Sequence, residues 1–142
     1  MKGSAPRVPV PQGNYLPARR HGNLIFTSGM TPRRDGVLVF KGAVRKDALL
    51  DDSRAAVVLA CNNALTAARG VLAAGEALTG ILSLTVYVAA EPGFEAHSKL
   101  ADFASAFLCE AMGEQGIGVR AAVGVATLPG DAPIEIQLVA FV

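Results

Sequence analysis

Residues 118–141 read GVRAAVGVATLPGDAPIEIQLVAF, two apolar runs that are joined by a turn and hold one charged side chain each. In the first run, residues 119–126 alternate between two faces, as in a β-strand. Arg120 shares its face only with Ala122, Gly124 and Ala126. Because a guanidinium can grip a carboxylate with two parallel hydrogen bonds, the pattern predicts room for a small anion beside Arg120. From the pattern alone, a single arginine in a strand is more often a surface charge or part of a structural ion pair.

The second run carries one carboxylate opposite a row of apolar residues. Glu135 alternates with Ile134, Ile136 and Leu138, after a stretch at 128–133 that is dense in turn-forming residues. A regular hairpin about this turn would leave Arg120 and Glu135 on the order of 20 Å apart, at about 3.3 Å per residue. We therefore expect the two charged groups to meet only across a subunit boundary, and a monomer to be inactive.

Outward from this stretch, the chain predicts further strands and two amphipathic helices. The order of strands, helix, strand, helix and strands indicates an α+β fold, with both helices on one face of a mixed sheet. Capping residues precede the first helix, and glycines follow both helices. The expected strands are 24–28, a hairpin of 37–40 with 43–44 around Lys41-Gly42, and 81–90; the expected helices are about 54–72 and 94–112.

Composition limits the classes of function. A chain of 142 residues is expected to form a single domain, 1–142, in which the proline-rich residues 1–13 are an extended lead-in. Hydrophobic residues make up 51% of the chain and charged residues 18%, which predicts buried interfaces between subunits. The net charge of +1 argues against a nucleic-acid partner. The sequence shows neither a membrane-spanning run nor a signal-peptide core, so we expect no membrane partner and a cytoplasmic location.

No metal or cofactor site is expected. His21 and His97 are far apart, and no pair of ligands has the spacing of a metal motif. Cys61 and Cys109 both lie in helical patterns, where free thiols are the better interpretation. The chain has no phosphate-binding loop, nucleotide fingerprint or G-x-S-x-G motif.

Two motifs resemble those of the RidA/YjgF family of enamine/imine deaminases. One is R-A-A-V-G-V-A-T-L-P at 120–129, followed by P-I-E-I at 133–136. The other is Tyr15 followed by G-N-L-I-F-T-S-G-M at 22–30. The resemblance implies a chorismate-mutase-like α+β fold and a homotrimer with ligand clefts between subunits. It also implies hydrolysis of 2-enamino or 2-imino acids to 2-oxo acids and ammonia, without a cofactor.

The resemblance also implies roles for particular residues. Arg120 would bind the substrate carboxylate, and Glu135 would hold or activate the hydrolytic water. Tyr15, Ser28 and Gly29 would shape the pocket, although Tyr15 could be an ordinary edge aromatic and Ser28-Gly29 a plain strand end. Ala122 would lie in the pocket where the best-known deaminases have a cysteine. Asp102 falls roughly where relatives carry an asparagine, and Met30 replaces their glutamine.

These departures, together with a longer loop at 113–118, keep two other functions open. One is non-catalytic binding or sensing of a small carboxylate metabolite at the same cleft. The other is endoribonuclease activity, which is ascribed to some relatives and against which the near-neutral charge argues.

Overall fold

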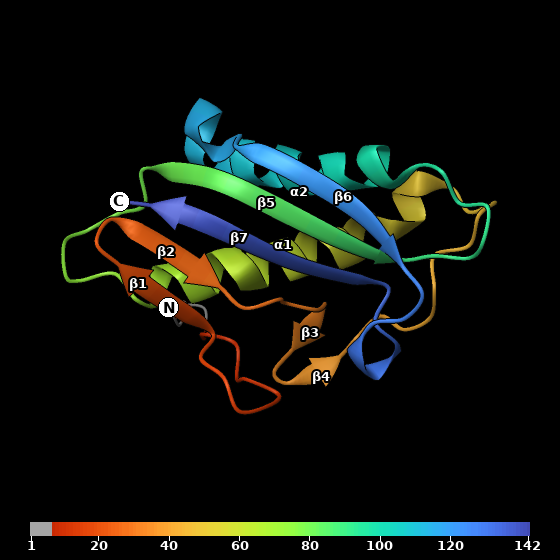
Figure 1. Cartoon of the computed structure of the whole chain (residues 1–142), viewed down its shortest axis with the longest axis horizontal. Helices are drawn as coiled ribbons and strands as arrows, with labels where there is room; N and C mark the ends of the chain where they lie inside the picture. The colour runs from red at the N-terminus through yellow and green to blue at the C-terminus, as the bar shows by residue number, and fades with distance from the viewer. Residues whose placement is uncertain (1–6) are drawn as a thin grey trace, which may run out of the picture.

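The computed structural model describes residues 7–142, so residues 1–6 of the predicted lead-in lie outside the described part. Two helices cover one face of a five-stranded sheet, and Figure 1 shows both helices behind the strands. The predicted α+β fold, with two helices on one face of a mixed sheet, is confirmed. The sheet runs in the order β1-β2-β7-β5-β6. Its strands are β1 (Ala18–His21), β2 (Leu24–Thr27), β5 (Gly80–Ala89), β6 (Val119–Val125) and β7 (Ile134–Phe141); the helices are α1 (Arg54–Arg69) and α2 (His97–Met112).

The core lies between the sheet and the helices, where the alternating residues of the strands meet the apolar stripes of α1 and α2. On β7, Ile134 and Ile136 are fully buried, and Val86 and Val88 of β5 lie beside them. Burial of apolar side chains such as these is a main driving force for folding, at roughly 25 cal/mol per Å² of apolar surface. The helices contribute Val57, Cys61, Leu65, Leu100, Ala104 and Leu108 to the same cluster.

A small second sheet forms earlier in the chain than the pattern predicted. Its strands are β3 (Arg33–Arg34) and β4 (Val37–Leu38), which pair antiparallel around Asp35 and Gly36. Both turn residues have positive φ, 52° and 80°, as a tight two-residue hairpin turn requires. The expected hairpin around Lys41-Gly42 is therefore wrong. Three short 3-10 helices complete the chain at η1 (Leu50–Ser53), η2 (Gly113–Gly116) and η3 (Pro129–Asp131).

The expected hairpin of the last two strands is also wrong, because β5 lies between β6 and β7. β5 pairs parallel with β6, where Leu84 faces Arg120, and antiparallel with β7, where Tyr87 faces Glu135. The chain enters β6 from α2, and such a helical crossover permits parallel pairing with β5. Two strand spacings and three residues of offset leave Arg120 and Glu135 on the order of 14 Å apart between Cα atoms, less than the hairpin implied.

The sheet face that carries no helix exposes several apolar side chains. Phe26 is 49% exposed, Val119 72% and Val123 41%. This is the surface on which the predicted subunit interface would form. Within residues 7–142, no helix combines the length and the hydrophobicity needed to span a lipid bilayer.

Candidate functional site

Arg120 points from β6 to α2, and its guanidinium is held by that helix. Nη1 donates to Oδ1 of Asp102 at 2.8 Å and to Oγ of Ser105 at 3.0 Å. Nη2 donates to Oγ of Ser98 at 2.9 Å and to the Ser98 carbonyl at 3.1 Å. Since the two terminal nitrogens carry four hydrogens, each hydrogen has an acceptor within the same chain. The Arg120 side chain is 20% exposed.

The small residues beside Arg120 make room for α2. Ala122 and Gly124 share the Arg120 face, and Ala122 packs against the core. The His97 ring lies so close to Gly124 that a Cβ on the glycine would be 2.6 Å from Nε2. His97 also meets the Phe94 ring edge-on, with centroids 4.9 Å apart. The expectation of open space on this face is therefore wrong, because a helix occupies it.

Glu135 lies on the other face of the sheet, above the backbone of Gly29. A Cβ on Gly29 would be 2.7 Å from Cδ of Glu135 and 2.9 Å from Oε2, so only glycine leaves the carboxylate its place. Met30 and Ile136 exchange backbone hydrogen bonds of 2.7 and 2.8 Å, which fixes residues 28–30 beside β7. Burial raises the pKa of the Glu135 carboxyl. Within residues 7–142, no hydrogen bond to this carboxylate offsets the burial.

Ser28 links the segment that carries Tyr15 to the glutamate. Its hydroxyl donates to the Leu16 carbonyl at 2.6 Å, and its backbone N–H donates to the Pro17 carbonyl at 2.9 Å. The Tyr15 side chain is 45% exposed, and its hydroxyl oxygen accepts a bond from the Gln12 backbone N–H. The Ser28 hydroxyl thus anchors Tyr15 and its neighbours beside Gly29.

The structure therefore divides the residues selected from sequence into two groups. We call Arg120, Ala122 and Asp102 the arginine end, and Tyr15, Ser28, Gly29 and Glu135 the glutamate end. Strand β5 lies between them, and the two charged side chains leave opposite faces of the sheet. Met30 belongs to neither end, because its side chain is 7% exposed and lies in the core.

Two residues that hold Arg120 were not predicted from the sequence. Ser98 and Ser105 bind Arg120 from the same helix face as Asp102. Residues at spacing i, i+4 and i+7 lie on one face of a helix. A polar row at 98, 102 and 105 within an apolar helix was therefore the signal that could have found them.

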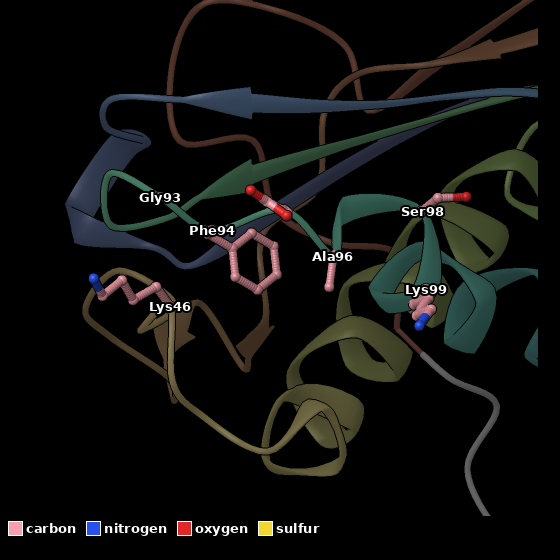
Figure 2. A pocket seen from close by; sticks show the side chains of 7 residues that line it. Lys46, Gly93, Phe94, Ala96, Ser98 and Lys99 are labelled. Carbon is pink, nitrogen blue, oxygen red and sulfur yellow. The ribbon is translucent and has the colours of Figure 1, made fainter.

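A surface cavity of about 480 Å³ adjoins the arginine end. Ser98 belongs to both, since it lines the cavity and accepts hydrogen bonds from Arg120. Figure 2 shows three of the side chains around this hollow, which are Lys46 from the segment before η1, Phe94 from the loop before α2, and Lys99 from α2 itself. In the described part of the chain, no group of three or more His, Cys, Asp or Glu side chains could hold a metal ion.

Comparison with known proteins assigns the chain to a family. Residues 5–142 match the family described as Endoribonuclease L-PSP, which is the RidA/YjgF family. The chain belongs to the RidA/YjgF family. It is 26% identical to Protein TCP17 of Trypanosoma cruzi over 133 residues, which cover 93% of this chain and 83% of TCP17.

Solved structures of similar proteins agree with this RidA/YjgF assignment. A protein of unknown function from Agrobacterium tumefaciens is 30% identical, with a TM-score of 0.83 over 91% of this chain and 82% of the other. The YjgF gene product of E. coli is 25% identical, with a TM-score of 0.70 over 94% of this chain and 92% of the other. These matches extend over almost the whole chain, including the strands that carry Arg120 and Glu135.

Proposed function

We propose that the protein is a cytoplasmic homotrimer that hydrolyses 2-enamino or 2-imino acids to 2-oxo acids and ammonia, without a cofactor. Membership of the RidA/YjgF family supports this reaction. The observation that carries it is the Glu135 carboxylate, which lies half-buried above Gly29 with a raised pKa and no hydrogen-bond donor from the described residues. Such a carboxylate keeps its lone pairs for a water molecule, and its raised pKa makes it a better proton acceptor than an ordinary glutamate.

The two ends would form one site across a subunit boundary. Within one chain Arg120 and Glu135 lie on the order of 14 Å apart and on opposite faces of the sheet, too far to hold one small substrate. A neighbouring subunit that packs against the β6 edge of the sheet would bring its own glutamate end near Arg120. We therefore expect mass photometry to show trimers, and dilution into monomers to abolish activity.

In the proposed reaction, Arg120 of one subunit binds the substrate carboxylate and Glu135 of its neighbour holds a water molecule. The water oxygen bonds to C2 of the protonated imine, the C=N electron pair moves to nitrogen, and Glu135 takes a proton from the water. Glu135 then returns this proton to the carbinolamine nitrogen, the C–N bond breaks, and the hydroxyl proton leaves with ammonia as the 2-oxo acid forms. Tyr15, Ser28 and Gly29 would border the substrate.

The reaction is tested by coupling a serine or threonine dehydratase to the purified protein and following release of the 2-oxo acid. The wild type should accelerate release, and Arg120→Ala or Glu135→Gln should reduce the acceleration about 100-fold or more. Glu110→Gln makes the same charge change as Glu135→Gln, but at an exposed position of α2, and should leave the acceleration intact. Absence of acceleration, or full acceleration by Arg120→Ala, would refute the catalytic proposal.

A second candidate is binding of a small carboxylate without turnover. Ala122 favours it, because the thiol of the best-known deaminases is absent. The Asp102 contact also leaves Arg120 suited to reversible exchange of carboxylates. Saturable binding of 2-oxobutyrate that Arg120→Ala abolishes, in a preparation that does not accelerate imine hydrolysis, would select this function.

A further inference from the structure

Asp102 already occupies the position that a substrate carboxylate would take on Arg120. Its Oδ1 accepts from Nη1 at 2.8 Å, the length of a charge-assisted hydrogen bond. Among residues 7–142, Nη2 is bound only by Ser98, through its hydroxyl and its carbonyl. The charge of Arg120 is therefore neutralised by its own helix before any ligand arrives.

The partners of Arg120 differ in how easily a ligand could replace them. The Asp102 side chain is 67% exposed, whereas the Arg120 side chain is 20% exposed. An exposed ion pair is worth only a few tenths of a kcal/mol to about 1 kcal/mol, so another carboxylate can compete for it. Ser98 and Ser105 would continue to hold the guanidinium in position after such an exchange.

We propose that Asp102 competes internally for Arg120 and makes the site prefer ligands that carry a positive nitrogen beside their carboxylate. This inference rests on the proposed carboxylate site. A ligand that displaces Asp102 leaves two carboxylates near one guanidinium, which is unfavourable for a plain 2-oxo acid. A protonated imino or amino group on C2 compensates the second negative charge, because it can lie beside the released Asp102 carboxylate.

This arrangement has a consequence for turnover. The protonated imine brings its own positive charge into the site, and hydrolysis removes that charge with the ammonia. The 2-oxo acid that remains faces Asp102 with no compensating cation, so Asp102 recovers Arg120 and the product leaves. Asp102 is thus a specificity-determining residue that discriminates substrate from product.

The test compares two ligands that differ only at C2, 2-aminobutyrate and 2-oxobutyrate, by isothermal titration calorimetry. The wild type should bind 2-aminobutyrate more tightly. Asp102→Asn should lower the Kd of 2-oxobutyrate about three- to fivefold and leave that of 2-aminobutyrate unchanged or higher, so the selectivity ratio falls. Asp102→Ser should lower the ratio in the same direction. Glu110→Gln should leave the ratio as in the wild type, since it changes the net charge equally on the same helix.

The outcomes separate this inference from the function on which it rests. If Arg120→Ala abolishes binding but Asp102→Asn and Asp102→Ser leave the selectivity ratio unchanged, the competition by Asp102 is refuted and the carboxylate site stands. If the wild type binds neither ligand, or binds both as Arg120→Ala does, the carboxylate site is refuted together with the inference. Because Asp102 is mostly exposed, both variants should keep the wild-type melting temperature.

Discussion

On β6 the Arg120 guanidinium donates four hydrogen bonds to α2, whereas on β7 the Glu135 carboxylate lies half-buried above Gly29 without a donor from the described residues. Both side chains belong to one continuous motif, yet their surroundings differ in kind. A charged group whose partners are complete adds to the stability of the fold, and one without partners costs stability. The difference shows that the guanidinium is already bound within its own chain and the carboxylate is not, so in the proposed function only the arginine end would first have to release a partner, Asp102.

The largest expected effect is at the glutamate end, on activity. Gly29→Ala would place a Cβ 2.7 Å from Cδ of Glu135 and push the carboxylate aside. Since a displacement of about 1 Å can cost on the order of 100-fold in rate, we expect kcat to fall about tenfold to 100-fold. The dehydratase-coupled assay measures the loss, and an unchanged melting temperature would show that the fold is intact. Wild-type kcat in this variant would contradict the role of Glu135.

The next effect is at the arginine end, on stability. Arg120→Ala removes four hydrogen bonds between β6 and α2, and we expect the free energy of unfolding to fall by about 1–2 kcal/mol. Urea denaturation at neutral pH measures it. Arg45→Ala is the matched control, because that side chain is 81% exposed and 4.0 Å from Glu91, and its loss should change stability by less than about 0.5 kcal/mol. Equal effects of the two variants would show that Arg120 does not stabilise the fold.

A smaller loss of stability is expected when only one of these hydrogen bonds to Arg120 is removed. Ser105→Ala removes the 3.0 Å acceptor of Nη1, and we expect a loss of about 0.5–1 kcal/mol in the free energy of unfolding. In an Arg120→Ala background the same change should cost almost nothing, because the bond is already absent. A double-mutant cycle by urea denaturation measures this coupling. Additive losses would mean that Ser105 acts independently of Arg120.

The smallest effect depends on pH. Because burial raises the folded-state pKa of Glu135, its ionised form destabilises the fold at pH values above that pKa. We expect Glu135→Gln to raise the free energy of unfolding slightly at pH 8, and the gain to shrink as the pH falls through the raised pKa. Glu110→Gln, on exposed α2 surface, should show no such trend. A constant difference between pH 8 and pH 4 would contradict the desolvation of Glu135.

The local sequence pattern predicted some side-chain positions of the candidate site correctly, but it did not predict what surrounds them. The alternation of Ile134, Glu135 and Ile136 placed the carboxylate correctly on the face away from the core. The alternation around Arg120 was also correct, but Ala122 and Gly124 accommodate a helix instead of a ligand. Small residues in a strand indicate only that something approaches closely, and sequence alone does not say what.

The connections between strands were the least predictable part. Residues 128–133 have the composition of a turn, yet they carry the chain past β5 to its far side. Strand order depends on which apolar faces bury the most surface together, a property of the whole sheet. The Asp35-Gly36 hairpin was not predicted either, although its two positive φ angles suit the residue types at the turn itself.

By itself, the sequence determined the helices, the strand faces, the family motifs and the presence of one arginine and one glutamate near them, because periodicity and residue type act locally. Only the tertiary structure decided that β5 separates the two charges, that Asp102 with two serines holds Arg120, and that Glu135 lies above Gly29. These contacts join residues far apart in the chain, and their geometry is set by how α2 and the sheet pack.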